Sequence, residues 1–308
     1  MFERTRPVAD PVTIRFDRRE VVAERGEPLA VALLAAGETT LARSPKLHRP
    51  RGPACMRGDC DGCLARVDGV PNVMTCLRTA GGGEEIGTQN VLGSRKTDLL
   101  RLTDWFFPRG IDHHHLMAGV PAVGTLMQTF ARQMAGIGRL PEATEAPHAA
   151  RRIEADVLIV GAGLAGLACA AALAKAGRKG IVVVDEQPAL GGSARWLASE
   201  AVEKRISLLG ANVSRLTSTT MVGYYDKTAL LVSEGAAVVA SPRALVLATG
   251  AHDGVLLTEG NDTPGVMGAR ALVSLASRGI VPREPAVLIG SGPWSDAASA
   301  LLGARVKA

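Results

Sequence analysis

The chain contains 308 residues, enough for two domains with sizeable cores. Apolar residues make up 47% of it and charged residues 21%, which is ordinary for a globular protein and excludes a low-complexity chain. Aromatic residues make up only 3%, and the net charge of +5 is spread without a Lys/Arg block, so we expect no nucleic-acid partner.

The first 95 residues carry the pattern of a small half-barrel of strands with one helix. Residues 12–22 (VTIRFDRREVV) predict two short strands that turn around Asp17 and Arg18. Residues 26–37 (GEPLAVALLAAG) predict a helix ended by glycine. After a loop over 49–62 that is rich in Gly, Pro and Cys, CLARVDGVPNVMTC predicts a hairpin that turns at Asp68–Gly69. The first residues, MFERTRPVAD, lack the apolar run of a secretory signal.

The second half of the chain alternates strands and helices. Residues 96–150 predict a connector, with a helix around 122–135 and the exposed linker PEATEAPHAA. From Arg151, ADVLIV predicts a buried strand, GLAGLACAAALAKAG a helix and KGIVVVDE a second strand. ALLVSE, AAVVA and RALVLATG predict later strands, so we expect an α/β domain with a parallel sheet over residues 151–255. The stretch 157–174 is uncharged, but its early glycines favour strand, turn and helix, and we expect no transmembrane segment.

Four of the five cysteines, Cys55, Cys60, Cys63 and Cys76, follow the spacing C-x4-C-x2-C-x12-C. The first three match the plant-type 2Fe-2S pattern. Three thiolates from one loop can hold one side of the cluster, and a strand returning through the hairpin supplies the fourth. Structural zinc and unligated thiols are the alternatives, but zinc sites usually consist of two short-spaced pairs. We therefore predict a 2Fe-2S cluster on these four cysteines, in a reducing compartment that we take to be the cytoplasm.

A glycine turn, with Gly161, Gly163 and Gly166, lies between the strand DVLIV and the helix that follows. The first glycine permits the tight turn, the second lets the backbone approach a pyrophosphate, and the third lets helix and strand pack closely. A second strand ends about 20 residues later at Asp185 and Glu186, as the dinucleotide fingerprint requires. Either acid could bind the ribose hydroxyls, and we favour Asp185.

Two further motifs resemble the flavoproteins with two dinucleotide-binding domains that are related to disulfide reductases. They are Gly191–Gly192, just after the acidic residues, and Ala248–Thr249–Gly250 at the end of RALVLATG. In such proteins the first glycine motif holds FAD. The resemblance therefore implies FAD, whereas the spacing alone does not decide between FAD and NAD.

A second turn, AVLIGSG with Gly290 and Gly292, would be the nicotinamide-type motif of such a flavoprotein. Ser295 replaces the third glycine, and the expected acidic partner would fall beyond Ala308. We therefore expect residues 256–308 to be the start of a second, incomplete nucleotide-binding domain and leave NAD(P) unassigned there. The chain is expected to be truncated or one piece of a split enzyme.

The order of these parts resembles the alpha subunit of heterotetrameric sarcosine oxidase and its relatives. Those relatives include subunits of hydrogen cyanide synthase, opine oxidases, and amino-acid dehydrogenases of the proline and hydroxyproline type. The matching stretches are RPRGPACMRGDCDGCLARVDGVPNVMTC, FFPRGIDHHHLM, VVVDEQPALGG, STTMVGYYDKTALL, ATGAHDG and NDTPGVM. The resemblance implies an α+β ferredoxin-like (β-grasp) 2Fe-2S domain over residues 1–95, followed by an α/β Rossmann-type FAD-binding domain.

The resemblance also implies a redox subunit of an amine or amino-acid dehydrogenase complex. In this hetero-oligomer, electrons would pass through the cluster and FAD between an acceptor and the flavin site of a beta-type partner subunit. A stand-alone NAD(P)H-dependent flavin and iron-sulfur reductase, and a truncated non-catalytic cluster-binding scaffold, are the alternatives. We assign no catalytic residue: three consecutive histidines at 113–115 cannot all face one ion, and Tyr224 and Tyr225 are expected at packed strand positions.

Overall fold

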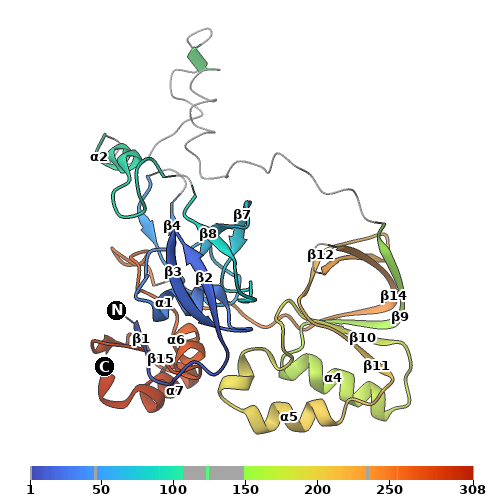
Figure 1. Cartoon of the computed structure of the whole chain (residues 1–308). Helices are drawn as coiled ribbons and strands as arrows, with labels where there is room; N and C mark the ends of the chain where they lie inside the picture. Colours follow the sequence, from blue (N-terminus) through green and yellow to red (C-terminus); the bar gives the residue numbers. More distant parts are fainter. Residues whose placement is uncertain are drawn as a thin grey trace. The chain divides into compact units, whose positions relative to one another are not determined.

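The computed structural model describes residues 2–44, 47–89, 91–106, 123–124, 149–233, 236–254 and 256–307. The chain divides into two compact units: unit 1 comprises residues 1–143 and 253–308, and unit 2 comprises residues 144–252 (Figure 1). In the described ranges, none of the helices is both long enough and apolar enough to span a bilayer. The helix expected around 122–135 falls, except for residues 123–124, outside the described residues, and the histidines at 113–115 fall wholly outside them.

Unit 1 contains a five-stranded mixed sheet in the order β3-β2-β8-β6-β7. Its first part comprises β1 Phe2–Arg4, β2 Pro11–Phe16, β3 Arg19–Glu24, α1 Leu29–Ala35, β4 Ala42–Arg43, β5 Pro50–Arg51, β6 Leu64–Val67, β7 Val70–Met74, β8 Glu85–Gly87, the 3-10 turn η1 Leu99–Arg101 and α2 Leu102–Phe106. The two expected hairpins are confirmed: Asp17 and Arg18 join β2 to β3, and Asp68 and Gly69 join β6 to β7, all with positive φ. Such pairs of left-handed residues match the twist of the strands that they connect.

Helix α1 is the central packing element of this sheet. Its residues Leu29 to Leu34 are at most 1% exposed, so the helix is apolar on every side because every side is buried. It ends shortly before Gly37, whose φ of 83° is the left-handed conformation that stops a helix. The helix expected over 26–37 is therefore confirmed, with shorter ends.

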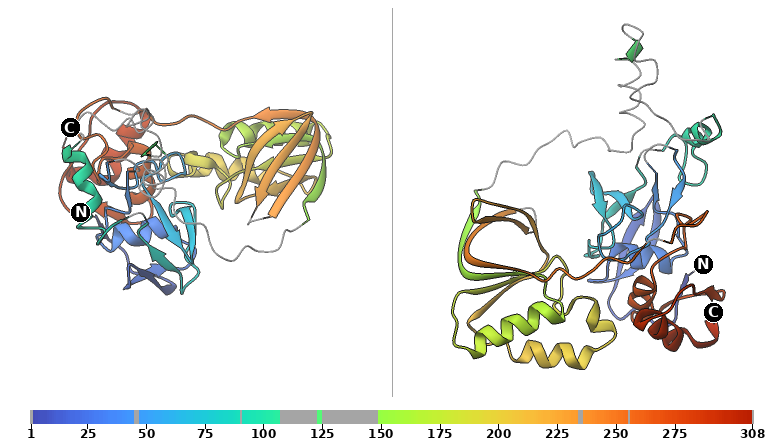
Figure 2. Two further views of the ribbon diagram at one scale, coloured as in Figure 1. Left: turned by 90° about the horizontal axis from the view of Figure 1, so that it is seen from above. Right: turned by 180° about the vertical axis from the view of Figure 1, so that it is seen from behind.

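The second part of unit 1 comes from the other end of the chain. It comprises α6 Ala269–Ala276, β15 Ile280–Pro282, β16 Ala286–Val287, α7 Pro293–Leu302, η3 Gly303–Arg305 and β17 Val306–Lys307. Strand β1 pairs antiparallel with β15, and Arg305 forms an ion pair of 2.7 Å with Glu3, so the labelled chain ends lie in the same unit (Figure 2). Strands β16 and β17 pair in parallel on either side of α7, which is a β-α-β arrangement around the second glycine turn.

Unit 2 is built on one six-stranded sheet in the order β11-β10-β9-β14-β13-β12. Its elements are β9 Arg151–Val160, α4 Leu164–Lys175, β10 Ile181–Val184, η2 Gly192–Trp196, α5 Ser199–Ser207, β11 Val213–Leu216, β12 Thr219–Tyr225, β13 Thr228–Ser233 and β14 Ala236–Leu247. Strands β11, β10, β9 and β14 run parallel to one another, whereas β13 is antiparallel to β14 and β12 is antiparallel to β13. Helices α4 and α5 lie on one face of the sheet (Figures 1 and 2), which confirms the expected Rossmann-type architecture.

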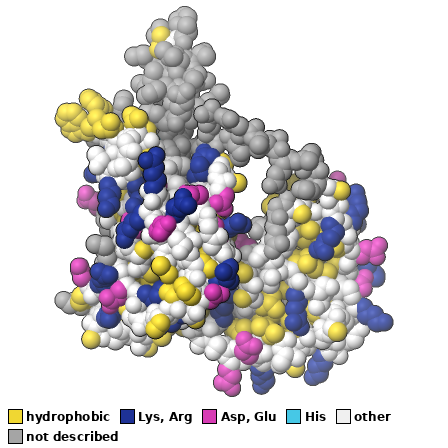
Figure 3. All heavy atoms as spheres, viewed as in Figure 1, with side chains coloured by type: hydrophobic (Ala, Val, Ile, Leu, Met, Phe, Trp, Pro, Cys, Tyr) yellow, Lys and Arg dark blue, Asp and Glu magenta, His cyan; other side chains and the backbone are white. Residues whose placement is uncertain are grey.

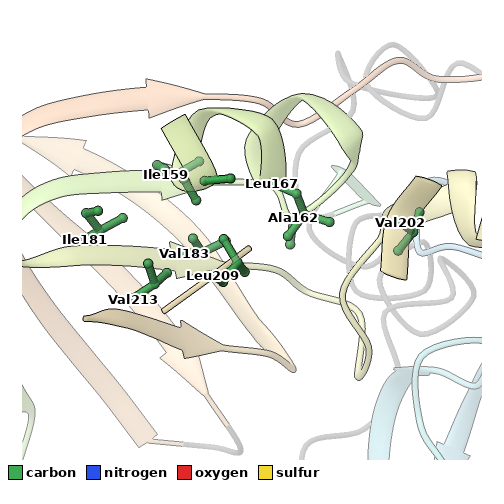
Figure 4. Close-up of a cluster of buried hydrophobic side chains, with 10 residues drawn as sticks. Ile159, Ala162, Leu167, Ile181, Val183, Val202, Leu209 and Val213 are labelled. Atoms are coloured by element: carbon green, nitrogen blue, oxygen red, sulfur yellow. The ribbon is translucent and has the colours of Figure 1, made fainter. Parts of the chain in front are cut away.

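The core between these helices and the sheet is aliphatic. Ile159 of β9 and Ile181 and Val183 of β10 are fully buried with Leu167 of α4, as Figure 4 shows. A second cluster, which includes Leu158 and buried residues of β13 and β14, covers the other face of the sheet. Both faces of β9 and β10 are therefore covered, which explains why these strands read as continuous apolar runs.

Two expectations for this sheet were wrong. AAVVA and RALVLATG form one strand, β14, that passes through Pro242. Strand β13 pairs with β14 only as far as Ala240, so the missing N–H of Pro242 leaves no ladder partner unsatisfied on that side. Tyr224 and Tyr225 are 39% and 70% exposed, and they lie at the end of β12, which is the last strand in the order of this sheet.

Candidate cofactor sites

The four clustered cysteines lie together in unit 1. Cys55, Cys60 and Cys63 come from the loop between β5 and β6, and Cys76 follows β7. The hairpin β6–β7 returns the chain so that Cys76 hydrogen-bonds with both Cys55 and Cys63, while Cys55 also hydrogen-bonds with Cys60. The sequence spacing and the hairpin thus bring all four sulfur atoms into one group, whereas Cys169 belongs to unit 2.

Backbone N–H groups point at these sulfurs. Cys55 Sγ accepts from the N–H of Asp59 at 3.2 Å and of Arg57 at 3.5 Å. The loop can turn its amides inward because Met56 and Gly58 have positive φ values of 55° and 87°. Such donors stabilise the negative charge that thiolates and a bound iron-sulfur cluster carry.

The same loop leaves no room for a side chain at Gly62. A Cβ atom there would lie 1.9 Å from the carbonyl oxygen of Gly52. The N–H of Gly62 and that of Ala54 both donate to Cys60. Gly62 therefore packs closely against the backbone of Gly52 while its N–H donates to the sulfur of Cys60.

Contact between the thiols shifts their pKa values in opposite directions. A hydrogen bond from Cys60 lowers the pKa of Cys55, and the same bond raises the pKa of Cys60. Cys76 donates in the same way to Cys55 and Cys63, which raises the pKa of Cys76 and lowers that of Cys63. Iron ions would replace these shared protons, because metal ligation requires thiolates.

The donor set fits a binuclear cluster. A 2Fe-2S cluster takes its four thiolates as two pairs, one for each iron. The contacts of Cys55 with Cys60 and of Cys63 with Cys76 provide two such pairs.

A segment from the far end of the chain supports the cysteine loop. The N–H of Gly268 donates to the carbonyl oxygen of Ala54 at 2.9 Å, immediately before Cys55. Arg51, at the start of the loop, forms an ion pair of 3.1 Å with Asp262. We call residues 262–268 the brace. The brace overlaps the NDTPGVM stretch that contributes to the family resemblance, but that stretch does not predict these contacts, because its partners lie about 200 residues away in the sequence.

The glycine turn of unit 2 has the geometry that its spacing predicts. Gly161 has a φ of 101°, and a Cβ there would lie 2.3 Å from the carbonyl oxygen of Ala248. A Cβ on Gly166 would lie 1.9 Å from the carbonyl oxygen of Gly161, so this glycine is required for helix α4 to pack against the turn. Gly163, which precedes the first residue of α4, has no atom within 4 Å of a Cβ. That space is where the backbone would approach a phosphate group.

Asp185 holds this turn in place. Its Oδ2 accepts from the N–H of Ala162 at 2.6 Å and its Oδ1 from the N–H of Gln187 at 2.8 Å. The residue is 9% exposed, and each carboxylate oxygen has a further lone pair. Its role as a ribose ligand, and that of the neighbouring Glu186, stays a prediction.

The other expected segments meet at the same turn. The N–H of Gly191 donates to the carbonyl oxygen of Ala162 at 2.8 Å, and Gly192 lies against Gly163. The Ala248–Thr249–Gly250 segment follows β14, and the N–H of Ala248 donates to Val160 at 2.8 Å. Unit 2 therefore brings Asp185, Gly191, Gly192 and Ala248 beside the glycine turn at the N-terminus of α4.

Comparison with known proteins agrees with both sites. Residues 9–91 match the family described as a 2Fe-2S iron-sulfur cluster binding domain, and residues 159–221 match the NAD(P)-binding Rossmann-like domain. The chain is 30% identical to the sarcosine oxidase alpha subunit of Rhizobium meliloti (strain 1021), over 90% of this chain and 32% of that protein. It is 32% identical to an opine oxidase subunit of Agrobacterium tumefaciens (strain Ach5), over 45% of this chain and 32% of that protein.

A solved structure extends the similarity to the fold. The L-proline dehydrogenase from P. horikoshii superposes with a TM-score of 0.70 and 22% identity, over 98% of this chain and 53% of that one. The chain spans about a quarter to a third of the length of the sarcosine oxidase alpha subunits that it matches. The chain is therefore a relative of the sarcosine oxidase alpha subunits and of these opine oxidase subunits, with a 2Fe-2S binding domain followed by a Rossmann-like dinucleotide-binding domain.

Proposed function

We propose that this chain is the electron-transfer subunit of an amine or amino-acid dehydrogenase complex. The observation that carries the proposal is the convergence of Cys55, Cys60, Cys63 and Cys76 in a chain that also folds a dinucleotide turn. When bound, a 2Fe-2S cluster and FAD supply one-electron and two-electron redox chemistry. The cytoplasm is the proposed location, because the free thiols must stay reduced until they bind iron.

The protein's part in this chemistry is to hold the two groups and set their surroundings. The four thiolates would ligate the irons, and the inward N–H groups of Arg57 and Asp59 would stabilise the reduced state by hydrogen bonding to Cys55. In unit 2, Asp185 accepts a hydrogen bond from the glycine turn, in which Gly163 would face the ligand. FAD is the proposed dinucleotide for two reasons. The chain is similar to sarcosine oxidase alpha subunits, and its motifs at 191–192 and 248–250 resemble those of flavoproteins that hold FAD at the first glycine motif.

A partner protein is part of the proposal. The relatives' names include the word subunit, and a beta-type flavoprotein that oxidises the amine would be the partner. An exposed aromatic pair on α2 supports a protein contact: Trp105 is 77% and Phe106 is 66% exposed, with ring centroids 5.1 Å apart. Hydrophobic side chains gather on the surface over this helix (Figure 3). Exposed aromatic groups of this kind are enriched at protein interfaces.

The first test is low-temperature EPR of the anaerobically purified chain after reduction with dithionite. We expect a rhombic spin-half signal that integrates to about one spin per chain, with iron and acid-labile sulfide in equal amounts. Flavin content after gel filtration tests the second site. Zinc in place of iron, or a chain that holds no flavin, would refute the proposal.

An NAD(P)H-dependent reductase is the second candidate. It is favoured by the β-α-β arrangement of β16, α7 and β17, in which Gly290 and Gly292 have φ values of 105° and 125°. The two candidates differ in their electron donor. NAD(P)H would bleach the flavin of the isolated chain in the reductase, whereas the subunit of a complex would need its partner and an amine substrate.

A further inference from the structure

Arg195 lies in the short turn η2 that follows the Gly191–Gly192 pair. This pair joins η2 directly to the glycine turn, since Gly191 donates to the carbonyl oxygen of Ala162 and Gly192 lies against Gly163. Arg195 itself packs beside Gly191, where a Cβ atom would lie 3.5 Å from the Cβ of the arginine. The Cβ of Arg195 thus lies beside the glycine pair that contacts the proposed phosphate site.

The guanidinium of Arg195 is half-buried, and it makes few hydrogen bonds. Its Nη1 donates to the carbonyl oxygen of Ala189 at 3.3 Å, and its Cζ lies 4.9 Å from the ring centre of Trp196. Its Nε is buried and has no hydrogen-bond partner. Burial lowers the pKa of Arg195, and the charge of Asp185 only partly opposes that effect.

No carboxylate within the described part of the chain forms an ion pair with Arg195. Asp185, the acid that influences it, already accepts hydrogen bonds from Ala162 and Gln187. Buried charges in proteins are normally paired, because an unpaired one carries a large desolvation cost. A planar guanidinium with unused donors is suited to bind a phosphate in particular.

We propose that Arg195 binds a phosphate group of the dinucleotide held by unit 2. This inference rests on the proposed dinucleotide site and adds a ligand that the glycine fingerprint does not contain. The N-terminus of α4 offers only partial positive charge to a phosphate, whereas Arg195 supplies a full one. The phosphate could be the pyrophosphate that FAD, NAD+ and NADP+ share or the additional 2′-phosphate of NADP+.

The test is isothermal titration of the full chain, freed of bound nucleotide, with FAD, NAD+ and NADP+. The variants are Arg195→Gln, which removes the charge, and Arg195→Lys, which keeps it. Loss of a charged hydrogen bond predicts affinity that is roughly 10- to 100-fold lower in the glutamine variant, with partial recovery in the lysine variant. Arg205→Gln is the control, because Arg205 also donates to a backbone carbonyl in unit 2, that of Ala201, but lies on α5.

The outcomes separate the two phosphates and the two proposals. Weakening of every dinucleotide that the wild type binds identifies the pyrophosphate, and weakening of NADP+ alone identifies the 2′-phosphate. Unchanged affinities in Arg195→Gln, with a thermal unfolding profile like that of the control, would overturn the inference and leave the dinucleotide site intact. A wild-type chain that binds none of the three would instead overturn the dinucleotide site itself, and Arg195 with it.

Discussion

The substitution Gly62→Ala tests whether the cysteine loop depends on close backbone packing. The added Cβ would lie 1.9 Å from the carbonyl oxygen of Gly52, and real Cβ contacts essentially never fall below 3.0 Å. The two strands of the loop would therefore have to separate by at least 1.1 Å, the difference between these distances. Overpacking costs about 1–3 kcal/mol, and we expect the upper end because both atoms belong to the backbone. The displacement would also move the N–H that Gly62 donates to Cys60.

The assay follows the visible absorption of the cluster during thermal unfolding, together with iron content and the EPR signal. About 3 kcal/mol corresponds to a roughly hundred-fold shift toward the unfolded state, so we expect a lower transition temperature and substoichiometric iron. Gly87→Ala is the matched control, since Gly87 lies in β8 of the same unit with an ordinary φ and nothing within 4 Å of its Cβ. If Gly62→Ala binds a full cluster and unfolds with the control, the packing argument is wrong.

Three further predictions concern the two sites and one ion pair. Gly163→Ala should fold normally but lose dinucleotide affinity, whereas Gly166→Ala should be destabilised by about 2–3 kcal/mol, because only the Cβ added at Gly166 meets protein atoms. Thermal unfolding followed by circular dichroism and titration with FAD distinguish the two variants. Equal stability and equal FAD affinity in both variants would contradict the geometry. Cys55→Ser should abolish the EPR signal and Cys169→Ser should leave it unchanged, so a signal that survives Cys55→Ser would show that this clustered thiol is not a ligand. Burial raises the pKa of Glu38, but the hydrogen bond and charge of Arg95 outweigh burial and hold that pKa below its usual 4.5. The pair therefore contributes stability above pH about 4.5 that is lost as the pH falls through the folded-state pKa. Glu38→Gln should reduce the pH dependence of urea unfolding below pH 4.5, and an unchanged slope would refute this assignment.

Local features of the fold could be predicted because short segments determine them. The turn at Asp68–Gly69 needs two left-handed residues, and Asp followed by Gly is a favoured pair for that conformation. The clashes that a Cβ would cause at Gly161 and Gly166 explain why glycine is found at those positions. The predicted 2Fe-2S domain and Rossmann-like domain, and the relationship to sarcosine oxidase alpha subunits, are confirmed.

The remaining features depend on contacts between distant segments, which the hydrophobic periodicity of the sequence does not predict. The hydrogen bond from Gly268 to Ala54 joins residues that are more than 200 positions apart, and the ion pair of Arg51 with Asp262 does the same. Arg195 belongs to no motif, and only the fold shows that its Nε is buried without a hydrogen-bond partner beside the glycine pair. The extension of β14 through Pro242 likewise depends on where the neighbouring strand β13 stops.

The pairing of β1 with β15 has a consequence for how the protein is made. Unit 2 lies in the sequence between the cysteine loop and the brace, so a ribosome completes the loop roughly 10–40 s before it completes Gly268, at about 5–20 residues per second. Throughout that interval Phe2, which is 6% exposed in the finished structure, lacks its partner strand. The nascent chain therefore presents an unsupported loop of thiols and an open strand edge at the same time. Iron delivery after synthesis, or a chaperone during it, would meet the protein in a form that the folded molecule no longer shows.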